Sequence, residues 1–556
     1  MKKHSLFSIF FIFILFIGFA AVPSHAYAED YGEEFPQENA WYQATPSVVW
    51  MDDPESTTTL EVHIVGRNDV ARVWVTDLGS DEEEGRKELF DDGTHGDETA
   101  GDNVFTLSDV VCPPYHASVG YDDWWGMLRV QLKDGTMMVN NYGMIVGMVD
   151  DEYKDIFPVQ EFGDGLWATP YAFFIEDTSY EIFADYPVSD IYCGQEHCSA
   201  AQKLYSVFPD VFDYVTLMPG MQVFRISGLA ENVPYHICVS NNVENIGLAI
   251  TDNTEKYGSD GRLKSFVYHS FGSNQIMDHE MGHLWSAYIG DSLGVTEGVH
   301  WNDMSDVQGQ MGLYYFEDEA VGHFAYNGDE TWNLIPNIDV EPYSPLELYV
   351  MGLIPSSEVP DIHILKNPDL TDTENITVDS YKTITMQQIV ESEGGERVPS
   401  YEDSQKDFNM AFVVAQDMPY NDAAYAYFSL VSLECLSCGP PLNYSFLAPF
   451  YWATGGRATL NTYLGDYGVL QIEATAEPTA VPEATPAAEP EESQTVEPET
   501  EEVATLLPTQ VITPEPETES EQQAQSLSTN SLLVISLVLA AGAFILAIFL
   551  IKTRKK

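Results

Sequence analysis

Basic residues are scarce in this chain. Its 556 residues include 23 Lys and Arg against 88 Asp and Glu, which gives a formal net charge of −65. No acidic residue lies within 1–28 or 531–556, and six of the basic residues do, so the rest of the chain carries 17 − 88 = −71. Such a charge disfavours nucleic acid and anionic membrane surfaces as partners. It fits solubility, divalent-cation binding or a salty environment equally well.

Apolar runs at the two ends predict export and anchoring. Residues 1–28 have a charged start, an apolar stretch and an A-x-A site, as in a signal peptide that is removed. Residues 531–551 are apolar and uncharged, long enough for one transmembrane helix, and the basic tail 552–556 is expected to stay cytoplasmic. We therefore expect a single-pass protein of the cell membrane with extracellular N-terminal domains.

Aromatic residues are almost missing from 473–527. Pro, Glu, Thr and Ala dominate this segment, so it cannot bury a core. We expect it to be a disordered stalk that separates the folded part from the membrane.

Cysteine is also rare, with six residues in the chain. In an exported protein, the close pairs Cys193/Cys198 and Cys435/Cys438 indicate local disulfides. A zinc knuckle built from Cys193, His197, Cys198 and a distant partner is the alternative.

Residues 46–150 are strand-like. Apolar and polar residues alternate in short runs between turns at Gly, Asp and Asn, which predicts an all-β sandwich of the immunoglobulin-like kind. Within it, four aspartates are spaced by glycines: Asp91, Asp92, Asp97 and Asp102. They fit either a Ca²⁺ site or a pair of Asp-Gly turns that needs no ion.

Residues 160–472 mix helical and strand patterns, which predicts an α+β domain. Residues 274–290 have helical period, and 344–353 begin with Ser344 as N-cap, Pro345 at N1 and Glu347 at N3. We expect strands before 274–290, and mostly helices and loops after it.

The stretch "HEMGH" contains two histidines four residues apart. On a helix, His279 and His283 project from one face, and Glu280 lies beside the first of them. Two neutral imidazoles can bind Zn²⁺ while the glutamate acts on a water molecule as general base. Chance produces this pattern only about 0.03 times in a chain of this composition. Gly282 disfavours helix, which indicates close packing of its backbone.

A catalytic zinc needs a third protein ligand. The compact form of the motif, with Gly and His further along the helix, is missing here. His300 is the favoured ligand, because a third neutral nitrogen completes a three-histidine site. Glu297 is the main rival. Glu347 is better explained as a capping residue, and Asp303 as a turn former.

Several stretches, among them "FPDVFDYVTL", "HEMGHLW", "SPLELYVMGLIP" and "YWATGGRATLNTYLG", resemble exported bacterial zinc metallopeptidases of the zincin clan. The stretch "DDGTHGDETAGDNVFT" is similar to a β-sandwich module often joined to exported proteins. The resemblance covers roughly 46–150 and 200–465. It implies a zincin fold, with metal ligands at His279 and His283 and the base at Glu280.

These features together predict a cell-surface zinc metalloendopeptidase that hydrolyses protein or peptide substrates. Its metal ligands would be His279, His283 and His300, and Glu280 would be the catalytic base. The alternative is a non-catalytic surface binding or adhesion protein that carries a zincin-like domain. Metal analysis combined with a protease assay separates these two hypotheses.

Overall fold

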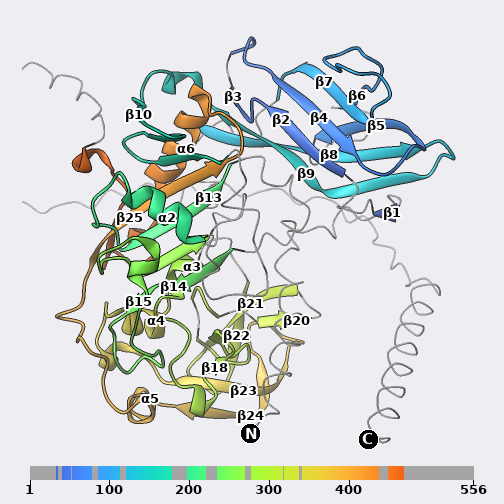
Figure 1. Cartoon of the computed structure of the whole chain (residues 1–556). Coiled ribbons are helices and arrows are strands. Elements are labelled where there is room, and N and C mark those ends of the chain that lie inside the picture. The colour runs from blue at the N-terminus through green and yellow to red at the C-terminus, as the bar shows by residue number, and fades with distance from the viewer. Residues whose placement is uncertain are drawn as a thin grey trace, which may run out of the picture. The chain divides into compact units, whose positions relative to one another are not determined.

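The computed structural model is shown in Figure 1. It describes residues 33–34, 40–51, 53–77, 86–112, 120–177, 197–220, 234–268, 277–307, 309–312, 314–316, 319–336, 341–436 and 449–468. All of them belong to one compact unit, Met1–Ala476. The expected signal peptide (1–28), stalk (473–527), membrane helix (531–551) and tail (552–556) lie outside the described residues. Among the helices that are described, none is both long and apolar enough to cross a membrane.

The N-terminal part is built from strands, as the alternating pattern predicted. The strands are β1 (Glu33–Glu34), β2 (Ala40–Thr45), β3 (Val48–Trp50), β4 (Thr58–Ile64), β5 (Val70–Asp77), β6 (Lys87–Leu89), β7 (Val104–Val110), β8 (Tyr121–Leu132) and β9 (Met137–Val149). One sheet has the order β1-β9-β8-β5-β6, with β3 also on β9, and the other has the order β2-β4-β7. The first strand of this second sheet precedes residue 46, where the sequence pattern placed the boundary.

The core of this part lies between the faces of the strands. Along β4, buried and partly exposed residues alternate strictly, which is the period-2 pattern of a half-buried strand. Leu60 and Val62 of β4 belong to the same buried cluster as Val73 of β5 and Trp124 of β8, which joins the two sheets. Burial of these apolar side chains is the main source of stability here.

A larger sheet organises the remainder of the described chain. Its order is β10 (Gln160–Gly163), β11 (Leu166–Ala168), β12 (Phe173–Glu176), β25 (Asp407–Gln416), β13 (Tyr214–Pro219), β17 (Ser265–Tyr268) and β14 (Tyr235–Cys238), with β26 (Thr459–Asn461) also on β25. The central pairs β12/β25, β25/β13 and β13/β17 are parallel. The strand β14 is antiparallel to β17 and forms one edge.

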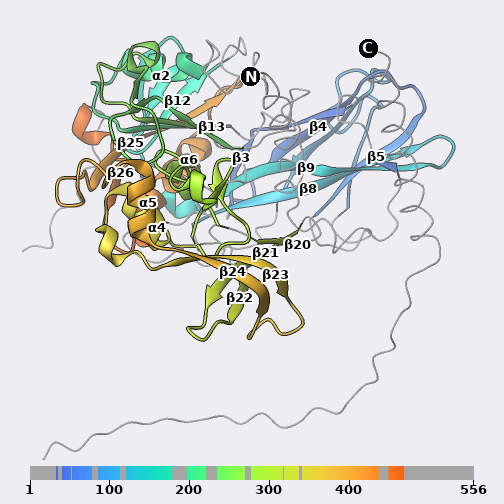
Figure 2. The ribbon, with the colours of Figure 1, turned by 90° about the horizontal axis from the view of Figure 1, so that it is seen from below.

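Helices cover both faces of this sheet (Figures 1 and 2). On one face, α2 (His197–Tyr205) shares a buried cluster with Val215 and Val413. On the other face, α3 (Met277–Gly282) and α6 (Asp422–Cys435) share a cluster with Tyr214 and Val414. Neighbouring residues of one strand therefore enter different cores, as expected for a sheet covered on both sides.

The expectation of mostly helices and loops after α3 is wrong. The chain continues with β18 (Thr296–Glu297), β19 (His300–Trp301), β20 (Tyr314–Phe316), β21 (Glu319–Tyr326), β22 (Trp332–Pro336), α4 (Pro345–Met351), β23 (Ile362–Asp369), β24 (Thr377–Ile384), α5 (Met386–Glu393), β25, α6, α7 (Phe450–Ala453) and β26. The central strand β25 is buried on both faces from Met410 onward, so residues 410–415 form a continuous apolar run. Such a run has no strand period and cannot be told from a buried helix by pattern alone.

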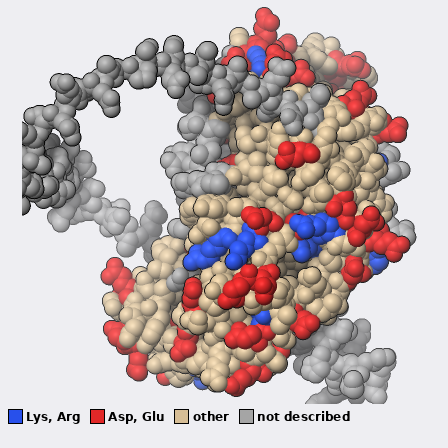
Figure 3. All heavy atoms as spheres, turned by 90° about the vertical axis from the view of Figure 1, so that its left-hand side faces the viewer, with Lys and Arg blue, Asp and Glu red and all other residues tan. Residues whose placement is uncertain are grey.

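The remaining short elements within the described ranges are β15 (Ser240–Asn241), β16 (Thr251–Asp252) and 3₁₀ turns at Asp151–Tyr153, Thr254–Tyr257, Asp291–Leu293, Ser356–Glu358 and Gly465–Tyr467. Acidic side chains are scattered over the face shown in Figure 3, where basic side chains gather in a band flanked by acidic ones.

The helix α6 joins the larger sheet to the N-terminal strands by packing on β3 and β9. Two tyrosine–carboxylate bonds strengthen this junction. The Tyr427 hydroxyl donates to Asp123 Oδ1 at 2.6 Å, and the Tyr121 hydroxyl donates to Glu434. Burial raises the pKa of Asp123 to about 7.

Candidate metal centre

The helix that carries the "HEMGH" motif is shorter than its sequence period indicated. The helix α3 spans Met277–Gly282, and the chain continues as turns in which His283 N donates to His279 O at 3.2 Å and Ser286 N donates to Gly282 O at 2.9 Å. The prediction of helix up to residue 290 is therefore wrong, and residues 274–276 lie outside the described part. The turn that separates His279 from His283 is nevertheless closed by a helical hydrogen bond, so both imidazoles remain on one side.

Close packing around Gly282 agrees with the expectation from its low helix propensity. A Cβ at this position would lie 2.8 Å from Met311 Cε and 3.0 Å from Tyr343 Cε1. The Tyr343 ring is itself held, because its hydroxyl donates to the carbonyl of Asp278. The backbone of α3 thus approaches its neighbours at a distance that only glycine permits without rearrangement.

Three imidazoles come together beside α3. One nitrogen from each of His279, His283 and His300 lies within 4.8 Å of the other two, and this is the set that the sequence favoured. His279 Nε2 lies 3.2 Å from His283 Nε2 and 3.2 Å from His300 Nε2. His300 lies outside the helix, on strand β19 of the hairpin that β18 and β19 form.

The outer nitrogens of two rings define their tautomers. Carbonyl oxygens only accept hydrogen bonds, so His279 Nδ1 must donate to Gln310 O at 2.6 Å, and His283 Nδ1 to Ser286 O at 3.2 Å. The facing Nε2 atoms then present lone pairs toward each other. Lone pairs repel at this distance unless a cation lies between them, so the donor set fits a metal ion such as Zn²⁺.

The electrostatic surroundings keep all three rings neutral. Burial lowers the pKa of His279 to about 4 and that of His300 to about 3, and the neighbouring His279 contributes to the second shift. Burial and then the adjacent imidazoles hold the pKa of His283 well below its usual range. Neutral imidazole is the form that binds a metal.

Glu280 lies next to this cluster without belonging to it. Its side chain is 5% exposed, and burial raises the pKa of its carboxyl to about 8. A carboxyl whose pKa is raised in this way is suited to accept and return a proton near neutral pH.

The other candidate ligands have different environments. Glu297 pairs with His300 across the β18/β19 hairpin but is exposed and lies outside the group of three. Burial and then Asp303 raise its pKa. Glu347 is fully buried and caps α4 through Ser344, as the sequence predicted. Its carboxylate also has partners that the sequence did not indicate.

A fourth histidine near the cluster was missed by sequence reasoning. His236 lies on the edge strand β14, which contacts α3, and its ring stacks on that of His283 with centroids 6.4 Å apart. Its Nε2 has no hydrogen-bond partner among the described residues, and burial lowers its pKa to about 3. Nothing in the local sequence marks His236, because only the pairing of β14 with β17 brings it to this side.

The aspartates of the N-terminal part are arranged mainly by turns. Asp91, Asp97 and Asp102 each place one oxygen within 4.8 Å of the others, and Asp92 is outside this group. Asp91 accepts from the backbone N–H groups of residues 101–103, and Asp97 accepts from those of residues 93 and 99. These bonds are those expected of aspartates that stabilise turns. The Ca²⁺ site stays a prediction.

The cysteine pairs are only partly visible. Cys193 and Cys438 lie outside the described residues, so both proposed disulfides and the zinc knuckle stay predictions. Cys435 is buried at the end of α6, with Sγ 3.6 Å from Val431 O.

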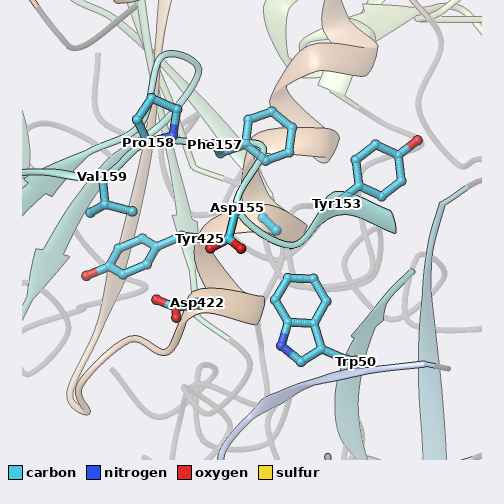
Figure 4. Close-up of a pocket in the computed structure, with 9 residues that line it drawn as sticks. Trp50, Tyr153, Asp155, Phe157, Pro158, Val159, Asp422 and Tyr425 are labelled. Carbon is cyan, nitrogen blue, oxygen red and sulfur yellow. The ribbon is translucent and has the colours of Figure 1, made fainter. Parts of the chain in front are cut away.

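A cavity of about 250 Å³ lies beside the start of α6 (Figure 4). Trp50 of β3 and Tyr425 of α6 line it, together with the carboxylates of Asp155 and Asp422. None of its lining residues belongs to the three-histidine group.

Comparison of the chain with models of protein families and with curated proteins finds no match.

Proposed function

We propose that this chain is a zinc-dependent metalloendopeptidase held at the cell surface. The observation that carries the proposal is the convergence of three neutral imidazoles, of which those of His279 and His283 are buried and that of His300 is partly buried, together with the buried side chain of Glu280 next to His279 in the chain. His279, His283 and His300 would hold the ion. When bound there, Zn²⁺ would supply Lewis-acid activation of a water molecule and of the scissile carbonyl.

The residues of the chain perform the proton transfers. Glu280 accepts a proton from the attacking water and returns it to the leaving amine. Its burial supports this role, since it raises the pKa of the carboxyl to about 8, and a group whose pKa lies near the operating pH can both accept and donate a proton. His236 is suited to donate a hydrogen bond to the developing oxyanion, because its ring is neutral and lies against His283.

The architecture supports the same proposal. The edge strand β14 of the larger sheet contacts α3, which carries His279 and Glu280, so a sheet edge lies next to the proposed ligands. The N-terminal strands agree with an immunoglobulin-like sandwich. The apolar run at 531–551 and the stalk at 473–527 would anchor the catalytic part outside the cell.

The test combines metal analysis with a protease assay on the full chain purified in detergent. We expect about one zinc per chain, and cleavage of labelled casein that o-phenanthroline abolishes and added Zn²⁺ restores. Zinc binding without cleavage of casein or of a random peptide library would favour the non-catalytic surface binding protein. Absence of zinc from protein prepared with zinc supplied would refute the metal centre itself.

A further inference from the structure

The carboxylate of Glu347 does more than cap a helix. Its side chain is 0% exposed, and in the capping box of α4 it accepts from Ser344 N at 2.6 Å, while Glu347 N donates to Ser344 Oγ at 3.3 Å. A capping box requires only this reciprocal pair. Full burial of the carboxylate therefore calls for additional partners.

Three further donors supply these partners: one belongs to Trp301, the last residue of β19, and two belong to residues 310–311 in the segment that continues from it. Oε1 accepts from Met311 N at 2.7 Å and from Trp301 Nε1 at 3.0 Å. Oε2 accepts from Gln310 N at 3.2 Å in addition to its bond in the capping box. Each oxygen thus accepts two hydrogen bonds, so the carboxylate is fully used by four donors.

The same segment determines the orientation of two proposed metal ligands. The carbonyl of Gln310 accepts the hydrogen bond from His279 Nδ1 at 2.6 Å, so it fixes the ring and the tautomer of that histidine. Trp301 directly follows His300, and its own N donates to Met311 O at 3.0 Å. One buried carboxylate therefore holds both the partner of His279 and the neighbour of His300.

The path of the segment is adapted to this contact. Gly309 has φ +106°, and a Cβ added to it would lie 2.1 Å from Glu347 Oε2 and 2.4 Å from Ser344 N. No side chain fits in that space, so glycine allows the backbone to come within hydrogen-bonding distance of the carboxylate.

We infer that Glu347 is a positioning residue of the metal centre, which acts on His279 through the Gln310 carbonyl and on His300 through Trp301. The inference rests on the proposed function, since positioning matters only if the histidines hold a metal. Loss of a group hydrogen-bonded directly to a metal ligand typically lowers metal affinity by about 10- to 100-fold. Glu347 acts one group further out, so we expect an effect at the lower end of this range.

The partners of Glu347 explain why glutamine is a poor replacement for it. All four are donors, and an amide would turn one acceptor oxygen into an NH₂ group. Whichever way the amide points, two of the four N–H groups face another donor and lose their bonds. Glu347→Gln therefore keeps the shape of the side chain and removes two of the four hydrogen bonds that it accepts.

The experiment measures zinc affinity by competition with a chromogenic chelator, together with kcat, KM and thermal unfolding. Glu347→Gln is expected to bind zinc about 10-fold more weakly than the wild type. Saturating zinc should restore most of its kcat, which a purely structural defect would not allow. Two matched variants remove a helix cap alone: Ser344→Ala in the same box and Gln388→Ala in the equivalent box of α5. Both should keep wild-type zinc affinity.

The outcomes separate this inference from the proposed function. If the wild type binds zinc and folded Glu347→Gln binds it equally well, the positioning role is wrong while the metal centre stands. Equal weakening in Ser344→Ala would also overturn it, because capping would then explain the effect. If Glu347→Gln does not fold, Trp301→Phe tests the same contact by removing a single donor, and unchanged zinc affinity in that variant overturns the inference. If the wild type binds no zinc, the proposed function is refuted, and the positioning role is refuted with it.

Discussion

Replacing Glu280 by glutamine separates catalysis from metal binding. The side chain is 5% exposed, and Gln has nearly the same volume, so no cavity forms and the fold is expected to persist. The three histidine nitrogens lie within 4.8 Å of one another without any atom of Glu280, so zinc should remain bound at about one per chain. Glutamine cannot accept the proton of the attacking water, and the proposed transfer is lost.

Removal of a general base costs about 10²- to 10⁴-fold in rate, or about 3–5 kcal/mol in activation free energy. We expect Glu280→Gln to lower kcat on a fluorescence-quenched peptide by this factor while KM changes little, because the group acts on water and not on substrate binding.

Glu297→Gln is the matched control for this variant. It makes the same chemical change at an exposed carboxylate beside His300, and its kcat should equal that of the wild type. Turnover by Glu280→Gln at the wild-type rate would refute the mechanism. Loss of zinc together with activity would show instead that Glu280 holds the structure of the centre.

Three more predictions follow from the same structure. His300→Ala should lose zinc at nanomolar free metal whereas Glu297→Ala keeps it, as measured by equilibrium dialysis, and the reverse pattern would place Glu297 in the site. Gly282→Ala should lower the free energy of unfolding in urea by up to about 2 kcal/mol, because overpacking against the Tyr343 ring, 3.0 Å from the new methyl group, outweighs the gain in helix propensity. Burial raises the pKa of Asp123 from 3.8 to about 7, so the folded chain holds a proton that the unfolded chain has released, and stability falls as pH rises through that window. Asp123→Asn should remove this fall, worth at most about 4 kcal/mol, and an unchanged pH dependence of the unfolding midpoint would contradict the assignment.

Local signals in the sequence were sufficient for several features. The capping box at Ser344 and Glu347 was predicted because its bonds join residues three apart. The strand-rich N-terminal part was predicted because one-sided burial leaves a period of two in the sequence. The two histidines of "HEMGH" were expected on one side because a single turn separates them, and the close packing at Gly282 was indicated by its cost to helix propensity.

Other features depend on contacts between distant segments. The strand β25 completes the larger sheet far along the chain from its neighbour β13, and burial on both faces removes the period that would have revealed it. His236 lies against His283 only because β14 pairs with β17. The helix α3 ends at Gly282, earlier than predicted, because apolar residues continue to recur at helical spacing up to residue 290.

The sequence by itself determined the motif, the choice of residue types for a metal and the cap of α4, because each depends on neighbours within one turn. Only the tertiary structure decided that His300, and not Glu297, joins the two motif histidines, since both residues pair within one hairpin, and in the fold His300 is partly buried while Glu297 is exposed. The tertiary structure also decided that the capping carboxylate of Glu347 meets three more donors. Spacing along the chain determines which groups one helix turn can join. A buried carboxylate needs hydrogen-bond donors, and the tertiary fold determines which distant residues provide them.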